Sequence, residues 1–215
     1  MKRFLAGVVV LCIMNVSAMA DRADFADDAV GTSPKGWIAT MTGEGNPKWT
    51  VEKDDSAPSK AKVLKQSGKA AYPLALKDGT SIKDGFVEVK FKAISGSEDR
   101  AAGLIWRVKD ANNYYVVRAN ALENNVVLYK TLNGKRSSLD IVGRKGGYGV
   151  KVPVPAGRWQ TLRVEFAGNR FNVIFNGKAV FEVEDATFSE AGHIGLWTKA
   201  DSVTMFDDFS YGTKE

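Results

Sequence analysis

Residues 100–130 read RAAGLIWRVKDANNYYVVRANALENNVVLYK, and this stretch decides the fold class. Apolar and polar side chains alternate along it, and polar breaks divide it into three segments. Successive side chains of a β-strand point to opposite faces of a sheet, so this period of two predicts three consecutive antiparallel strands. The stretch is also rich in Arg, Asn, Tyr and Trp. A sheet face that only meets water can be built from Lys, Glu, Ser and Thr. Planar polar and aromatic side chains instead favour a binding site for a polar ring-shaped ligand such as a sugar.

The same alternation continues through the rest of the chain from Gly85 onward. Apolar residues recur at every second position in three further segments, 87–91, 162–166 and 171–175. Dipeptides that accept positive φ separate alternating segments and predict tight hairpins, namely Asn133-Gly134, Gly168-Asn169 and Asn176-Gly177. No long amphipathic helix is visible, and residues 185–192 allow at most a short helical turn. The pattern predicts an all-β fold of two antiparallel sheets, a β-sandwich or jelly roll.

The segment 21–83 has a different composition, richer in Gly, Pro, Ser and Lys. It predicts two or three short strands, around Trp37, Trp49 and residues 71–76, joined by long loops. Neither an internal repeat nor a linker divides the chain, and one all-β domain can exceed about 200 residues. Residues 21–215 are therefore expected to form a single β-sandwich domain.

Residues 1–20 have the three parts of a secretory signal peptide. Lys2 and Arg3 give a basic start, residues 5–14 are mostly apolar, and Ala18-Met19-Ala20 is a small-x-small cleavage pattern. The apolar run is too short for a transmembrane helix, and no second one follows, so we expect no membrane insertion after cleavage. The mature protein is expected to be exported to the periplasm or the extracellular space.

Charge and cysteine content limit the partners and the source of stability. The formal net charge is +5, and basic residues are scattered among acidic ones, so nucleic acid is not expected as a partner. The only cysteine, Cys12, leaves with the signal peptide. An exported chain without disulfides has to rely on a large apolar core.

The familiar catalytic patterns are incomplete. Glu182 and Glu184 share one strand face, but Ala186 occupies the third position of the acid-x-acid-x-acid pattern found in many β-sandwich glycosidases. The glycine-rich segment 143–149 leads into Pro-rich sequence rather than a helix, so it is no phosphate loop. The sequence contains no G-x-S-x-G nucleophile elbow with which His193 could form a catalytic triad. A solvated strand edge and a loop are the simpler interpretations of the first two patterns.

Metal ligands are scarce. With His193 as the one histidine and no mature cysteine, a zinc site of the usual type is excluded. Calcium needs only oxygen ligands. The candidate calcium ligands are Asp207 and Asp208 near the C-terminus, joined by Asp24, Asp27 and Asp28 if the terminal strands lie together. Acid pairs at strand ends are more often solvated or capping groups. No cofactor is therefore expected to be required, and calcium remains an option.

Strand parity places a set of polar side chains on one outer, concave sheet face. Its members lie opposite the apolar residues of their own strands: Arg107, Arg118, Asn120, Trp197 and Lys199. A ring can stack on the C–H face of a sugar, and Arg and Asn can bond its hydroxyls. The alternative is a cross-strand polar ladder, in which Glu123, Glu182 or Asp201 pairs the cations.

Four motifs give the chain a family resemblance. They are G-L-I-W-R-x-x-D-x-x-N-Y-Y-x-x-R from Gly103, G-R-W-x-x-L-R-V from Gly157, F-N-G-K from Phe175 and G-x-I-G-L-W-T from Gly192. Together they resemble the 3-keto-disaccharide hydrolase domain family, whose members are often labelled similar to family 16 glycoside hydrolases. The resemblance covers roughly residues 85–211. It implies a concanavalin A-like (LamG-like) jelly roll and a carbohydrate-related, extracytoplasmic protein.

The chain departs from the hydrolase-type members of that family at two places. Residues 100–107 stand where an N-S-G-I-type strand is expected, and residues 120–125 are nearest to the acidic G-x-E-x-Q-x-x-D segment. Glu123 is thus the residue that would inherit a catalytic role, and the resemblance alone does not establish catalysis.

Three functional hypotheses follow. The first is an exported carbohydrate-binding protein in which Arg107, Arg118, Asn120 and Lys199 bond hydroxyls and Trp197 stacks. The second is a glycoside hydrolase or 3-keto-disaccharide hydrolase with Glu123 as acid or base. The third is a structural envelope protein without a small ligand. An enzyme needs a carboxylate beside the arginines in a deep cleft, whereas a binding protein needs only an open groove and an aromatic ring.

Overall fold

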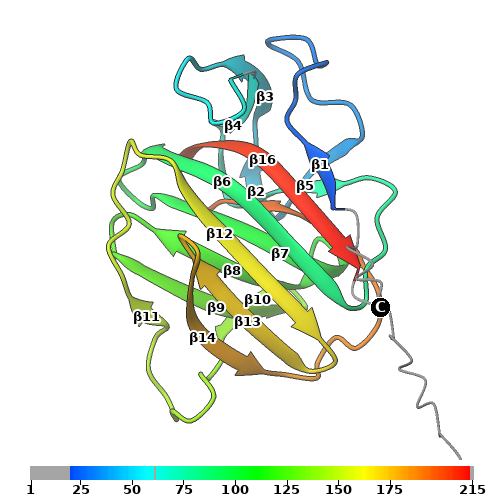
Figure 1. Cartoon of the computed structure of the whole chain (residues 1–215), viewed down its shortest axis with the longest axis vertical. Helices are drawn as coiled ribbons and strands as arrows, with labels where there is room; N and C mark the ends of the chain where they lie inside the picture. Colours follow the sequence, from blue (N-terminus) through cyan, green and yellow to red (C-terminus); the bar gives the residue numbers. More distant parts are fainter. Residues whose placement is uncertain (1–19, 61, 214–215) are drawn as a thin grey trace, which may run out of the picture.

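Two antiparallel β-sheets of eight strands each lie face to face (Figure 1). The computed structural model describes residues 20–60 and 62–213. The first sheet has the order β14 (Lys178–Glu184), β13 (Arg170–Phe175), β12 (Gln160–Ala167), β6 (Gly85–Ser95), β16 (Val203–Thr213), β4 (Lys62–Gln66) and β3 (Trp49–Lys53), with β1 (Asp21–Ala23) paired to β16. The second has the order β10 (Lys135–Ser138), β9 (Asn125–Leu132), β8 (Asn113–Asn120), β7 (Ala101–Asp110), β15 (His193–Trp197), β5 (Lys69–Lys77) and β2 (Trp37–Asn46), with β11 (Val150–Lys151) paired to β9. The predicted all-β sandwich is confirmed.

The space between the sheets is filled by every second side chain of the central strands. Val87, Val89 and Phe91 of β6 are fully buried, as are Leu104 and Trp106 of β7. All of them belong to one apolar cluster that joins the two sheets. Burial of apolar surface contributes about 25 cal/mol per Å². Because the chain has a single cysteine, this layer is its main source of stability.

Trp106 lies at the centre of that layer. Its ring stacks on Tyr115 of the same sheet at 5.4 Å between centroids and on Phe166 of the first sheet at 5.9 Å. Phe171 of β13 meets it edge-on at 5.3 Å. Aromatic pairs at these separations add to the stabilisation that burial alone gives. One side chain therefore ties β7 and β8 to β12 and β13.

The predicted hairpin turns are present. Asn133 and Gly134 have φ values of 51° and 76° and join β9 to β10. Asn176 and Gly177, at 49° and 75°, join β13 to β14. This double positive φ is what Asn-Gly supplies most easily in a two-residue hairpin. Residues 185–192 form a loop without a helical turn.

The N-terminal part contains more strand than the sequence pattern indicates. Five strands, β1 to β5, lie before residue 78, where two or three were expected. The ten-residue β2 forms one edge of the second sheet, and most of its side chains are exposed. An edge strand with solvent on its side chains needs no apolar alternation, so its sequence carries little signal of its own.

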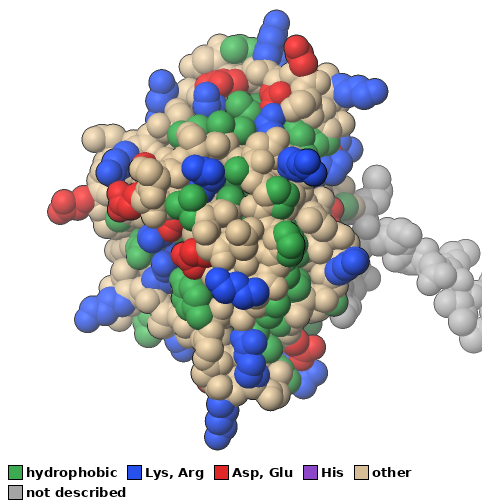
Figure 2. Space-filling view, turned by 90° about the vertical axis from the view of Figure 1, so that its left-hand side faces the viewer, with side chains coloured by type: hydrophobic (Ala, Val, Ile, Leu, Met, Phe, Trp, Pro, Cys, Tyr) green, Lys and Arg blue, Asp and Glu red, His purple; other side chains and the backbone are tan. Residues whose placement is uncertain are grey.

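The expected signal peptide, residues 1–20, lies outside the described residues except for Ala20. Within the described part, no helix is long and apolar enough to cross a membrane. On the face that Figure 2 presents, Lys and Arg side chains are spread among acidic and apolar ones rather than gathered into one patch.

Replacing Trp106 with alanine tests the central position of this ring. We expect the free energy of unfolding to fall by about 3–5 kcal/mol, since the substitution empties a fully buried site between two sheets. Urea unfolding followed by circular dichroism measures the change. Leu132→Ala, at a β9 residue with 42% exposure, is the control and should cost less than about 1 kcal/mol. Equal losses for the two variants would contradict this account of the core.

Candidate functional site

The outer face of the second sheet is itself apolar and buried. Ile105, Val116, Val127, Tyr129 and Trp197 are at most 3% exposed and form a cluster separate from the inter-sheet core. Strand parity in the sequence predicts a polar face here. The structure shows a polar layer lying on an apolar one, so the charged groups above this sheet sit in surroundings of low dielectric constant.

Trp197 belongs to this face but is fully buried. Gly103 makes room for it, since a Cβ there would lie 3.1 Å from Cε3 of the tryptophan ring and 2.9 Å from the carbonyl oxygen of Val117. Tyr72 stacks on the ring at 5.6 Å, and the Arg136 guanidinium lies 5.4 Å from its centroid. Parity assigned the correct side of the sheet, but the proposed role of Trp197 as a stacking platform is wrong for this conformation, because other side chains cover it.

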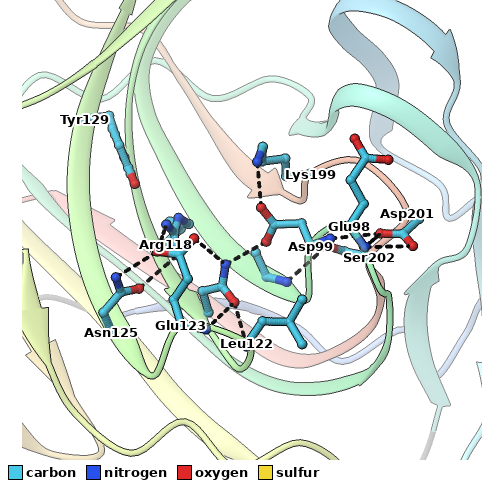
Figure 3. A network of polar contacts seen from close by, with 12 residues as sticks. Glu98, Asp99, Arg118, Leu122, Glu123, Asn125, Tyr129, Lys199, Asp201 and Ser202 are labelled. Carbon is cyan, nitrogen blue, oxygen red and sulfur yellow. Dashed lines mark hydrogen bonds and ion pairs between the residues drawn. The ribbon is translucent and has the colours of Figure 1, made fainter. Parts of the chain in front are cut away.

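Arg118 is the centre of the polar layer (Figure 3). The residue is 1% exposed. It donates from Nη1 to Oδ1 of Asn125 at 3.0 Å and from Nη2 to Oε2 of Glu123 at 3.0 Å. The guanidinium lies 5.7 Å from each of the Tyr129 and Tyr148 ring centroids. Burial by itself lowers the pKa of Arg118, but the two tyrosines and Glu123 outweigh it, and the pKa is raised. The buried group is a permanent cation.

Glu123 lies in the turn between β8 and β9 and faces Arg118. Its carboxylate accepts hydrogen bonds from Arg118, from Asn120 at 3.2 Å and from Asn125 at 2.9 Å, and its side chain remains 39% exposed. Partial burial raises the pKa of this carboxyl, but the Asn125 and Arg118 hydrogen bonds and the nearby positive charges prevail, and the pKa is lowered. Glu123 is therefore an ionised acceptor at neutral pH.

Asn120 extends the contacts toward a second ion pair. It donates to Oδ1 of Asp99 at 2.7 Å, and Lys199 pairs with Oδ2 of the same carboxylate at 2.8 Å. Asp99 is 2% exposed and Lys199 30% exposed. The result is a continuous chain of contacts from Arg118 through Glu123, Asn120 and Asp99 to Lys199, which we call the Arg118–Lys199 network. Its two ends, Arg118 and Lys199, are labelled in Figure 3.

The loop that carries Asp99 is held by Asp201. This carboxylate accepts hydrogen bonds from the backbone N–H groups of Ser97, Glu98 and Asp99 at 2.8–3.2 Å. Against the raising effect of burial, these N–H groups hold the pKa of Asp201 well below its usual range. The polar-ladder interpretation predicted that Asp201 pairs a cation. In the structure Asp201 instead fixes the loop by accepting its backbone N–H groups.

Tyr148 closes the other end of the network. Its hydroxyl accepts hydrogen bonds from Nη2 of Arg118, at 2.9 Å, and from the hydroxyl of Tyr129. The residue is nevertheless 47% exposed, so the ring presents a surface to solvent. The following Gly149 has φ +58°, and a Cβ there would lie 2.2 Å from the Val126 carbonyl oxygen. Only glycine allows the loop to approach β9 this closely, and that approach places Tyr148.

A hollow of about 460 Å³ adjoins the Lys199 end of the network. Its lining residues come from β2, β5 and the loops before β7 and after β15: Glu44, Gly45, Lys69, Ala70, Ala71, Tyr72, Glu98, Lys199 and Ala200. Two ammonium groups and two carboxylates balance their charges in this lining, and Lys69 pairs with Glu98 at 3.1 Å. The hollow and the network together make one polar surface with aromatic rings at both ends.

Arg136 of β10 is a member of this surface that sequence reasoning missed. Its guanidinium carbon lies 4.3 Å from the Tyr129 ring centroid and 5.0 Å from that of Tyr72. The signal was available, because a two-residue Asn133-Gly134 turn pairs Arg136 with Thr131 and so places it on the Tyr129 face. The alternation of β10 itself is too short to show this.

Arg107 does not join this face, and the expectation that it does is wrong. The register of β7 against β8 shifts after Trp106, and Arg107 itself has φ +47°. This irregularity turns its side chain toward the Phe166 and Phe171 rings, where it donates to the carbonyl oxygens of Phe188 at 2.8 Å and Gly168 at 2.7 Å. Parity counting fails across a bulge. Arg107 is a structural residue that holds loops together.

The acidic calcium candidates have other partners. Asp207 is fully buried and accepts the N–H groups of Ser59, at 2.8 Å, and of Asp208. Asp208 pairs with Lys90 at 2.7 Å and with Arg22. Among the described residues, no group of three or more His, Cys, Asp or Glu side chains is placed to hold a metal ion. These carboxylates cap backbone groups and pair with cations.

Glu182 and Glu184 are likewise engaged on the first sheet. Both pair with Arg170, at 3.1 and 2.7 Å. This arrangement is the solvated strand edge that the sequence favoured.

The two antiparallel sheets place the chain in a defined class, the jelly-roll β-sandwiches. The family described as 3-keto-alpha-glucoside-1,2-lyase-like domain matches residues 24–210, and the chain belongs to that family. The resemblance read from the four motifs is thereby confirmed. A comparison with curated protein sequences found no match.

Solved structures share the fold at low sequence identity. The carbohydrate-binding module CBM66 from Bacillus subtilis aligns with a TM-score of 0.64 at 23% identity, over 82% of this chain and 95% of that one. The cellulose-induced protein Cip1 gives a TM-score of 0.63 at 15% identity, over 90% and 96% of the two chains. The β-glucanase of Bacillus licheniformis gives 0.57 at 12% identity, over 94% and 100%. At such identities the likeness shows a shared jelly-roll fold and nothing more.

The lowered pKa of Glu123 predicts a pH-dependent contribution to stability. A carboxyl whose pKa is depressed by folding stabilises the native state above its unfolded value, here 4.5, and loses that effect as the pH falls through the folded value. Glu123→Gln should therefore cost about 1 kcal/mol at pH 7, with partial exposure limiting the loss, and less below pH 4. Urea unfolding at both pH values measures this. The exposed Glu190→Gln is the control, and a Glu123→Gln deficit independent of pH would contradict the assignment.

Proposed function

We propose that the protein is an exported carbohydrate-binding protein that holds a sugar against the Arg118–Lys199 network. One observation carries the proposal. The buried Arg118 orients both the ionised Glu123 carboxylate and the hydroxyl of the half-exposed Tyr148 at one surface. A sugar ring presents a C–H face for stacking and hydroxyls for charge-assisted hydrogen bonds, and this surface offers a partner for each.

Preorganisation supports binding at this place. Tyr148 accepts two hydrogen bonds through its hydroxyl oxygen, which leaves its own hydrogen available to a ligand. Lys199 is tied to Asp99, yet it also lines the hollow and keeps ammonium hydrogens for a sugar hydroxyl. Groups that are already held in position lose little conformational entropy on binding. The family and the names of the structurally similar proteins add support for a sugar or glycoside as the partner.

The alternative is a glycoside hydrolase or 3-keto-disaccharide-cleaving enzyme, favoured by membership of a family described as lyase-like. Glu123 would be its acid or base. Its lowered pKa makes it a poor general acid, and the three donors on its carboxylate weaken it as a base. Asp99 is occupied by Lys199 and Asn120. Binding is therefore the function that this geometry supports better.

Calorimetric titration of the mature protein with a panel of di- and oligosaccharides tests the binding site. For a sugar that binds, Tyr148→Ala and Lys199→Gln should each weaken the Kd about tenfold or more, the usual effect of losing a stacked ring or a charge-assisted hydrogen bond. Lys178→Gln is a matched control on the first sheet, and it should leave the Kd unchanged. Wild-type affinity in both site variants would remove the site assignment.

The same panel separates the three functional hypotheses. Incubation with glycosides and their 3-keto derivatives, followed by chromatography of the products, detects turnover. Turnover that disappears in Glu123→Gln would establish the enzyme and displace the binding proposal. If the protein shows neither binding nor turnover, the structural envelope protein is the remaining hypothesis.

Export is tested by the N-terminus of the mature protein. Asp21, the first residue after the expected cleavage, also begins β1 and pairs with Tyr211. Mass spectrometry of the protein from the periplasmic or culture fraction should find a chain that begins at Asp21. A chain that retains residues 1–20 and stays in the cell would contradict the signal peptide.

A further inference from the structure

Arg136 differs from the other cations of the site in its partners. Arg118 pairs with Glu123, Lys199 with Asp99, and Lys69 with Glu98. None of the ion pairs within residues 20–60 and 62–213 involves Arg136, and its Nη1 is buried there without a hydrogen-bond acceptor. A buried donor without an acceptor is costly, so the absence calls for a physical reason.

Aromatic rings hold the guanidinium in place. It lies 4.3 Å from the ring centroid of Tyr129, 5.0 Å from that of Tyr72 and 5.4 Å from that of Trp197. Cation–π contacts stabilise the charge without using up the in-plane hydrogen-bond directions of the guanidinium. Arg136 is thus both fixed and unneutralised.

The three rings also define where Arg136 lies within the site. Tyr72 lines the hollow, and Tyr129 contacts the Arg118 guanidinium and the Tyr148 ring. Arg136 therefore joins the hollow to the Arg118–Lys199 network. The other cations at this place each pair with a carboxylate, so Arg136 is the one cation of this surface that has no ion pair among the described residues.

We propose that the sugar bound at this site is acidic, and that Arg136 receives its carboxylate, as in a uronic acid residue. This inference rests on the proposed sugar-binding function and specifies its ligand class. A guanidinium presents parallel N–H groups that match the two oxygens of a carboxylate. The apolar layer beneath Arg136 strengthens that pairing relative to one in water. A sulfate ester on the sugar offers the same anionic oxygens and is distinguished in the test.

The experiment compares oligosaccharides of equal length in four forms: uronic acid, its methyl ester, the neutral hexose and the sulfated hexose. The methyl ester keeps the shape of the sugar and removes the charge. Calorimetry at low and high salt should show the uronic acid binding at least about tenfold more tightly than its ester. This preference should shrink as salt rises. Arg136→Gln should abolish the preference, and Arg136→Lys should keep part of it.

Lys135→Gln is the matched control, since Lys135 is the exposed cation next to Arg136 on β10. It should retain the full preference for the acid. Near-ultraviolet circular dichroism checks that each variant is folded, and the comparison of acid with ester in the wild type needs no variant. Neutral sugars bound as tightly as acidic ones would overturn this inference and leave the binding function intact. Tighter binding of the sulfated form would overturn the choice of carboxylate. Failure of every sugar to bind would remove both proposals.

Discussion

The second sheet has to bury both of its faces, and the organisation of the site depends on this constraint. One face packs against the first sheet around Trp106, and the other carries the apolar cluster of Ile105, Val116 and Val127. Polar side chains at the margin of that cluster are removed from bulk water. A charge in such surroundings is tolerated only with close partners. The buried cations therefore constrain the positions of the carboxylates that neutralise them and of the amides and rings that contact them.

Arg118 illustrates this relation between burial and site geometry. Its charge is compensated by Glu123, and Glu123 is in turn held by Asn120 and Asn125. The same compensation that stabilises Arg118 lowers the pKa of Glu123. A general acid for glycoside cleavage needs the opposite shift, produced by an apolar pocket without a cation. The electrostatic cost of burying one arginine thus directs this surface toward hydrogen bonding of a ligand and away from proton donation.

Sequence patterns predicted the fold well because the inter-sheet core repeats at every second residue. They also grouped Arg118, Asn120 and Lys199 on one face, together with Glu123 as a pairing partner. The errors have local physical causes. The bulge after Trp106 turns the Arg107 side chain away from the face that parity assigns to it, and the sequence alone does not reveal this bulge. Parity placed Trp197 on the correct side, but it says nothing of the Arg136 and Tyr72 side chains that cover it.

Tyr129 couples the two arginines of this surface. Its ring lies 5.7 Å from the Arg118 guanidinium carbon and 4.3 Å from that of Arg136, and its hydroxyl donates to Tyr148. Burial raises the pKa of Tyr129, so the ring stays neutral and offers its π-face rather than a negative charge. Two cations on one neutral ring repel each other in surroundings of low dielectric constant, and only Arg118 has a carboxylate to offset this. An anion at Arg136 would relieve the remaining repulsion. In the proposed complex, relief of this repulsion between Arg118 and Arg136 would contribute to the binding free energy of an acidic ligand.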